Sequence, residues 1–195
     1  DYGSFCTGSL IDPYWVLTAS HCVSGAWDYE GYGLSPYVYQ GKSETNYVTR
    51  VKVRETYMHP SYDYTSQYVV PYDIALVELT SPINGIDLMV LSTTPPSVGT
   101  VLTFAGYGVT SWNGQAGGGT KRFTDIPVDS FHNPDYYTSY DPNTNVCSGD
   151  SGGPSFLEFT QGRVQFGVNR SVGSYGNDAC DGGWNDSTRV DKYIT

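Results

Sequence analysis

The segment CSGDSGGP, residues 147–154, places a serine among glycines. Clustered glycines cost conformational entropy on folding, so a site explains such a run better than packing does. Ser151 becomes a nucleophile only when a base accepts its proton and backbone N–H groups stabilise the developing oxyanion. We expect the N–H groups of Gly149 and Ser151 to form this oxyanion hole, because Gly149 has no side chain to block the approach.

The chain offers three histidines as the base. His21 follows the apolar run 15–19 and precedes Cys22, so its position would be fixed. His59 and His132 lie beside prolines or in turn sequences, and a surface loop explains each of them more simply. The sequence therefore predicts His21 as the general base.

A third group has to hold the imidazole in the correct tautomer, and in such sites it is commonly a buried carboxylate. Asp73 opens the apolar segment DIALVEL, residues 73–79, so we expect its carboxylate to be partly buried and to need a partner. Asp28 and Asp63 lie in polar, tyrosine-rich loops and have ordinary solvated explanations. Asp73 is thus the predicted third member of a triad.

The elements that must position these residues are predicted to be strands. Charged residues make up 15% of the 195, glycine (23) and tyrosine (18) are abundant, and the apolar runs are short, as in an all-β protein. One helix is predicted, over the last residues, Ser187–Ile194. The expected strands are Gly8–Ile11, Trp15–Ala19, Tyr37–Gln40, Thr49–Tyr57, Ile74–Leu79, Thr100–Tyr107, Arg122–Val128, Pro154–Phe159 and Arg163–Asn169.

Two β halves are expected, because the stretch that contains Pro95 and Pro96 separates one group of strands from the next. Residues 1–94 would carry the histidine and the aspartate, and residues 95–195 the nucleophilic serine. Many short strands separated by turns are typical of barrels or sandwiches.

The charge of the chain argues against several classes of partner. A net charge of -10 and only ten Lys and Arg spread along the chain disfavour nucleic acid. A run of about 18 apolar residues, which a membrane span requires, does not occur. The sequence has no calcium loop either, and we expect neither a metal nor another cofactor.

The four cysteines lack the CxxC spacing and the histidine clusters of zinc sites. They allow three disulfide connectivities, of which sequence proximity favours Cys6–Cys22 and Cys147–Cys180. Disulfides indicate an oxidising compartment, and so a secreted protein.

Four segments, CTGSLI (6–11), WVLTASHC (15–22), DIALVEL (73–79) and CSGDSGGP (147–154), resemble the trypsin/chymotrypsin family of serine endopeptidases. The order histidine, aspartate, serine is that of this family and differs from subtilisins and α/β-hydrolases. The resemblance implies two antiparallel six-stranded β-barrels packed face to face, with a short C-terminal helix and the triad in the cleft between the barrels.

The resemblance also assigns the chemistry. Ser151 would attack the carbonyl carbon, His21 would act as base and then as acid, and Asp73 would orient His21. The pairs Cys6–Cys22 and Cys147–Cys180 match pairs that the family bridges.

In the family, a new N-terminus pairs with the aspartate that precedes the nucleophile, here Asp150. This chain begins at Asp1, five residues before Cys6, so we expect it to lack that segment and the first strand. Either it was trimmed from a longer precursor, or Asp150 has another partner. An unpartnered buried carboxylate is costly, and Asp150 lies in the loop that forms the oxyanion hole.

Asn145, six residues before the nucleophile, would lie at the base of the pocket for the side chain before the scissile bond. A neutral asparagine cannot supply the charge with which trypsin-like enzymes select Arg or Lys. An apolar or aromatic residue is our first expectation. Asp181 or Asp186 could restore a basic preference, although each is more simply a solvated loop carboxylate.

Residues Ser171, Val172 and Gly173 resemble the family segment that pairs with an extended substrate, in which Ser171 would also bond Asp73. One extra residue is needed between Gly167 and Ser171 to align this segment. Gly173 would leave the pocket entrance open.

The sequence predicts a secreted, monomeric serine endopeptidase with polypeptide substrates and protein protease inhibitors as partners, and without nucleic-acid or membrane partners. One alternative is a catalytically silent or zymogen-like protease fold that binds partners. Another is an esterase or amidase that uses the same nucleophile, because acyl transfer to water is the same chemistry.

Overall fold

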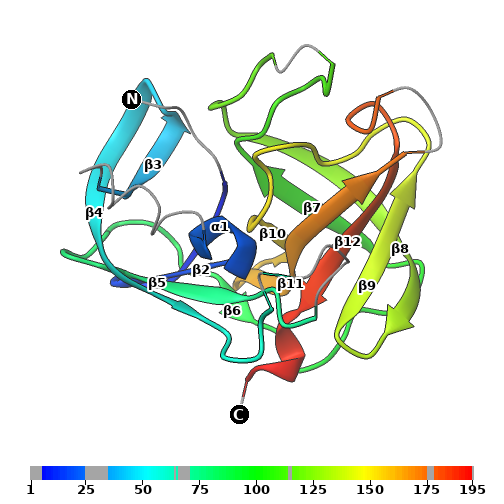
Figure 1. Ribbon diagram of the computed structural model, residues 1–195, viewed down its shortest axis with the longest axis horizontal. Helices are drawn as coiled ribbons and strands as arrows, with labels where there is room; N and C mark the ends of the chain where they lie inside the picture. The colour runs from blue at the N-terminus through cyan, green and yellow to red at the C-terminus, as the bar shows by residue number, and fades with distance from the viewer. Residues whose placement is uncertain are drawn as a thin grey trace.

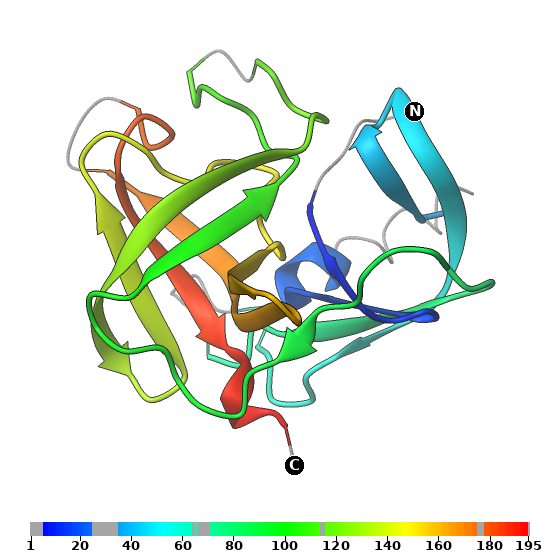
Figure 2. The same cartoon turned by 180° about the vertical axis from the view of Figure 1, so that it is seen from behind.

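The computed structural model describes residues 6–24, 35–63, 65, 71–113, 116–174 and 178–194, apart from the side chains of residues 132 and 133. Its strands form two halves that lie side by side, and the short helix α1 (Ser20–Ser24) lies where the halves meet (Figures 1 and 2). In the described part of the chain, no helix is long and apolar enough to cross a membrane.

The first half is an antiparallel five-stranded sheet in the order β1-β2-β5-β4-β3. Alternation in β5, ALVEL, turns Ala75, Val77 and Leu79 inward, where they pack with valines of neighbouring strands such as Val16 and Val53. The strands are β1 (Ser9–Asp12), β2 (Trp15–Thr18), β3 (Tyr37–Ser43), β4 (Asn46–Met58) and β5 (Ala75–Leu79).

The second half is a closed barrel, because the strands in the order β10-β7-β8-β9-β12-β11 are joined again by the pairing of β10 with β11. Leu102, Phe104, Ile126, Val128 and Tyr137 fill its interior. The strands are β7 (Val101–Gly106), β8 (Arg122–Asn133), β9 (Tyr136–Asp141), β10 (Pro154–Phe159), β11 (Gly162–Gly173) and β12 (Gly183–Arg189), and the two-residue β6 (Val90–Leu91) pairs parallel with β11.

A further cluster joins the halves and sets the positions of the site residues. It contains Leu17, Ala19, Ile74, Val168 and Val190, all buried. Ala19 and Ile74 lie within two positions of His21 and Asp73, and Val168 lies three positions before Ser171. Burial of this cluster therefore holds α1, the start of β5 and the end of β11 next to each other.

The all-β architecture and the closed barrel are confirmed, and every expected strand overlaps an observed one. In the described residues the first half is a curled sheet of five strands, where the family resemblance implied a six-stranded barrel and its first strand was expected to be missing. The expected helix Ser187–Ile194 is wrong, because residues up to Arg189 continue β12 and only Val190–Lys192 form a 3₁₀ turn. The helix α1 was not expected.

Candidate active site

His21 and Asp73 form a doubly hydrogen-bonded pair. The His21 Nδ1 atom lies 2.7 Å from Asp73 Oδ2, and the His21 backbone N–H donates to Asp73 Oδ1 at 2.9 Å. Asp73 is only 4% exposed, and the Ser20 hydroxyl ties α1 to the Ile74 carbonyl at 2.6 Å. Because the carboxylate accepts from Nδ1–H, the Nε2 atom of His21 is left as the proton acceptor.

The nucleophile loop, residues 147–153, needs glycine at two positions. Gly149 has φ = +95° and Gly152 has φ = +81°, a region that side chains other than glycine rarely occupy. The Gly152 N–H donates to the Asn169 carbonyl at 2.7 Å and fastens the loop to β11. Among the described residues nothing accepts from the N–H groups of Gly149 and Ser151, the two predicted oxyanion donors.

Thr7, a residue not predicted from the sequence to act in the site, ties this loop to the first half. Its N–H donates to the Ser151 carbonyl at 2.8 Å, and its hydroxyl donates to the Gly149 carbonyl at 2.8 Å. The same hydroxyl accepts from the Tyr107 N–H at 3.1 Å, and the Thr7 carbonyl accepts from Thr18. The only available signal was a threonine in the CTGSLI segment.

We expect Thr7→Val to lower the free energy of unfolding by about 1–3 kcal/mol, because the partly buried Tyr107 N–H and the Gly149 carbonyl each lose a partner. Thr7→Ser keeps the hydroxyl and serves as the control. Denaturant unfolding measures both variants. Equal stability of Thr7→Val and Thr7→Ser would show that the hydroxyl bonds contribute nothing.

The Cys6–Cys22 disulfide lies between the histidine and the nucleophile loop. Cys22 Sγ is 3.8 Å from His21 Nε2 and 3.5 Å from the Ser151 carbonyl oxygen. The Ser151 hydroxyl makes no hydrogen bond to His21 here, and such bonds often tighten only when substrate binds. Cys6, His21 and Cys22 are grouped like metal ligands, but two bonded sulfurs are not thiolates.

Asp150 is held by backbone amides. Its carboxylate accepts from the Gly108 N–H at 2.7 Å and from the Cys147 N–H at 2.8 Å. A Cβ at Gly106 or Gly108 would overlap this carboxylate, so both glycines make room for it. Burial raises the pKa of the Asp150 carboxyl, and the two amides and then the Arg122 charge oppose the rise. Asp150 therefore has hydrogen-bond partners within the described chain. Another partner for Asp150 was one of the two alternatives that the sequence left open.

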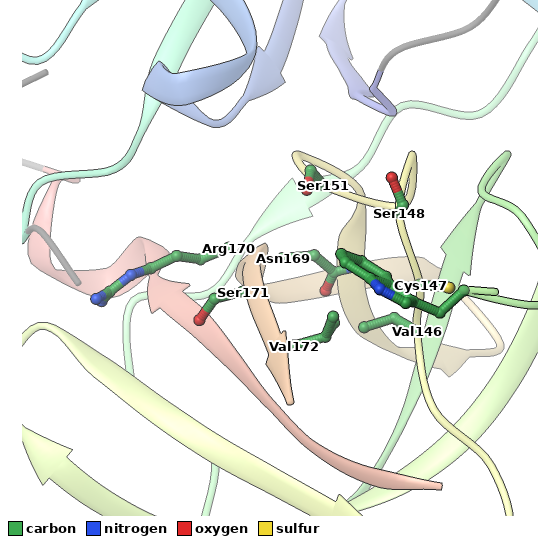
Figure 3. A pocket seen from close by; sticks show the side chains of 9 residues that line it. Val146, Cys147, Ser148, Ser151, Asn169, Arg170, Ser171 and Val172 are labelled. Atoms are coloured by element: carbon green, nitrogen blue, oxygen red, sulfur yellow. The ribbon is translucent and has the colours of Figure 1, made fainter. Parts of the chain in front are cut away.

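A small cavity of about 130 Å³ lies beside Ser151 (Figure 3). In Figure 3, Ser151 and Ser148 lie at one end of the cavity, and Val146 and Val172 lie at the other. The second disulfide, Cys147–Cys180, supports its wall. The lining residues are Trp112, Val146, Cys147, Ser148, Ser151, Asn169, Arg170, Ser171 and Val172.

Residues 1–182 match the trypsin family model. The chain belongs to the trypsin family. It is 31% identical to brachyurin from Leptuca pugilator, over 97% of this chain and 84% of that protein. It is 29% identical to a trypsin from Saccharopolyspora erythraea, over 79% of this chain and 71% of that protein. It is 26% identical to kallikrein-1E2 from Equus caballus, over 90% of this chain and 71% of that protein. Membership in this family of serine endopeptidases supports a protease function.

Within this trypsin-family fold, the expected hydrogen bond from Ser171 to Asp73, the predicted triad aspartate, is not observed. Its hydroxyl donates to Asp186 at 3.2 Å, because the pairing of β11 with β12 shifts register between Asn169 and Ser171. The extra residue that the alignment required is therefore a bulge at Arg170. Ser171 lines the cavity, whereas its hydroxyl points to Asp186 and not to Asp73.

Asn145 and Gly173 also lie differently from the sequence prediction. Asn145 does not line the cavity, and its amide is saturated: it donates to the carbonyls of Ala179 and Trp184 and accepts from the Val146 N–H and from Asn185. Gly173 packs against the Trp184 indole, where a Cβ would not fit, so Val172 borders the cavity instead. The expected open entrance at Gly173 is not observed.

The two aspartates that could have restored a basic preference do not line the cavity. Asp186 is buried and accepts from Thr138 at 2.6 Å as well as from Ser171. Asp181 is exposed. Of the remaining candidates, His59 stacks on Tyr72, and Asp28 lies outside the described residues.

Proposed function

We propose that this chain is a secreted serine endopeptidase that cleaves polypeptides through an acyl-enzyme on Ser151. The observation that carries the proposal is the His21 Nδ1–Asp73 Oδ2 bond of 2.7 Å, made by a histidine whose neighbour Cys22 contacts both His21 Nε2 and the Ser151 carbonyl through its sulfur. That bond orients the ring with Nε2 free to accept a proton.

In the proposed reaction, the Ser151 hydroxyl oxygen attacks the scissile carbonyl carbon while His21 Nε2 accepts the hydroxyl proton. The N–H groups of Gly149 and Ser151 donate to the oxyanion of the tetrahedral intermediate. His21 then gives its proton to the leaving amine, and the acyl group stays on Ser151. Water, deprotonated by His21, hydrolyses this ester and restores the serine.

Substrate binding would use the free edge of β11. Beyond Val168 this strand pairs only with β12 in the described residues, so the other edge of Ser171–Gly173 is open. An extended polypeptide, whether a substrate or the loop of a protein inhibitor, can add to such an edge through backbone hydrogen bonds. The side chain before the scissile bond would then enter the cavity beside Ser151, with Asn145 supporting its wall from behind.

Secretion is supported by the two disulfides, which persist in oxidising compartments. The relatives named as trypsin, kallikrein and brachyurin are compatible with this location.

The test is hydrolysis of an unfolded protein substrate by the chain, with the products mapped by mass spectrometry. We expect cleavage by the wild type and a loss of at least 10³-fold in Ser151→Ala, because the nucleophile is gone. Ser97→Ala, at an exposed loop serine, is the matched control and should cleave normally. Equal turnover by Ser151→Ala and the wild type would refute the proposal, and binding without cleavage by the wild type would favour a silent protease fold.

A further inference from the structure

Asn169 brings an unsatisfied acceptor to the cavity beside Ser151. The residue is 2% exposed and lines the cavity, yet its Oδ1 atom has no hydrogen-bond partner among the described residues. Its Nδ2 atom donates to the Asp150 carbonyl at 3.2 Å. Because that carbonyl can only accept, the amide orientation is fixed, and the oxygen is the atom left without a partner.

Figure 3 shows the Asn169 oxygen directed toward the end of the cavity where Val146 and Val172 lie. These side chains are apolar and cannot donate to it. A buried acceptor without a donor costs free energy, and a ligand that brings an N–H group into the cavity removes this cost.

The rest of the cavity carries no negative charge in the described residues. The Asp150 carboxylate is held by the amides of Gly108 and Cys147, and Asp186 accepts from Thr138 and Ser171. Neither aspartate lines the cavity. A lysine or arginine side chain would therefore lose its hydration without gaining an opposite charge.

Among the described residues that line the cavity, the one cationic side chain is directed elsewhere. Arg170 stacks over the Tyr136 ring at 4.2 Å, and Figure 3 shows its guanidinium pointing away from the cavity. An acidic substrate side chain thus finds no cation directed into the cavity among the described lining residues. The lining also carries the hydroxyls of Ser148, Ser151 and Ser171, but its buried acceptor without a partner is Asn169 Oδ1.

We propose that Asn169 is the specificity-determining residue of this site and selects substrates with a carboxamide side chain, glutamine or asparagine, before the scissile bond. This inference rests on the proposed endopeptidase function. A carboxamide is uncharged and carries two N–H donors, one of which pairs with Asn169 Oδ1. An apolar side chain of the same shape leaves this acceptor unpaired, and sites of that kind discriminate strongly against such analogues.

The test compares peptide substrates that differ only at this residue, in the pairs glutamine and methionine, and asparagine and leucine. For the wild type we expect kcat/KM to favour the amide by about tenfold or more in each pair. Lysine and glutamate substrates should be cleaved more slowly than glutamine. In Asn169→Val the amide preference should fall to about onefold or below.

The ratio of kcat/KM between the amide and the apolar substrate of a pair distinguishes a role of Asn169 in specificity from a purely structural role. Loss of the Asn169 bond to the Asp150 carbonyl would lower the turnover of both members of a pair together and leave their ratio unchanged. If Asn169→Val does not fold, the wild-type ratios still decide, because a wild-type preference for methionine, leucine or lysine overturns the inference.

The fraction of each variant that a fluorophosphonate labels at Ser151 distinguishes the proposed endopeptidase function from the proposed role of Asn169. A labelled wild type without the amide preference, or a labelled Asn169→Val that keeps it, overturns the role of Asn169 and leaves the endopeptidase standing. A wild type that neither labels nor cleaves refutes the endopeptidase, and the role of Asn169 falls with it.

Discussion

Asp73→Asn is expected to lower kcat for peptide hydrolysis by roughly 10⁴-fold, the general magnitude for a triad of this family with an inverted tautomer. The asparagine oxygen would take the Oδ1 position, since the His21 backbone N–H donates there at 2.9 Å. The NH₂ group would then face Nδ1, where Oδ2 now accepts at 2.7 Å. Nδ1 would become the acceptor, and Nε2 would carry the proton and could not take one from Ser151.

Two measurements separate this effect from damage to the fold. Denaturant unfolding should show Asp73→Asn still folded, since the backbone bond to His21 remains. Asp63→Asn, at an exposed aspartate, is the matched control and should keep wild-type kcat. An Asp73→Asn variant within tenfold of the wild type would show that Asp73 does not set the His21 tautomer.

Asp150→Ala should lower kcat by roughly 10²–10³-fold, the cost of losing one oxyanion donor. The Asp150 carboxylate holds the amides of Gly108 and Cys147, and the next residue before it is the predicted donor Gly149. Without these bonds the loop loses its fixed shape. At low pH we also expect the free energy of unfolding to fall by about 1–3 kcal/mol, from the two unsatisfied donors. The readouts are kcat and denaturant unfolding.

The pH dependence of that loss has a definite sign. Burial raises the pKa of Asp150 above its ordinary value of 3.8, so the native state holds this proton more strongly than the unfolded state does. The contribution of the Asp150 carboxyl to the free energy of unfolding of the wild type is therefore fully present below pH 3.8. This contribution declines as the pH rises through the raised pKa. The stability gap between the wild type and Asp150→Ala should narrow over that window. A gap that widens as the pH rises would mean that the amides outweigh burial.

The sequence was sufficient for the parts of the site that depend on local pattern. Asp73 could be chosen because a carboxylate at the start of an apolar strand needs a partner, and it pairs with His21. The glycines around Ser151 marked a loop with special backbone geometry, and two of them have positive φ. Each of these signals is contained in a few neighbouring residues of the chain, although the segments themselves lie far apart in the sequence.

The sequence was insufficient where polar side chains are buried by tertiary contacts. The strands β9 and β12 were missed because inward residues such as Ser139, Asn185 and Ser187 are polar yet fully buried. The partner of Ser171 depends on a bulge at Arg170, which only the strand register reveals.

Asn169 was overlooked for the same reason. An asparagine at the end of an apolar strand looks like a strand end, and only the packed barrel shows that its amide is buried beside the nucleophile loop. The signal in the sequence was a polar residue directly after the buried Val168.

The central claim is that Ser151, activated by His21, is the nucleophile, and fluorophosphonate labelling followed by peptide mapping tests it most directly. We expect one label per wild-type chain, on the peptide that contains Ser151, no label in Ser151→Ala and much slower labelling in His21→Ala. A wild-type chain that stays unlabelled, or a Ser151→Ala chain that labels as the wild type does, would contradict it.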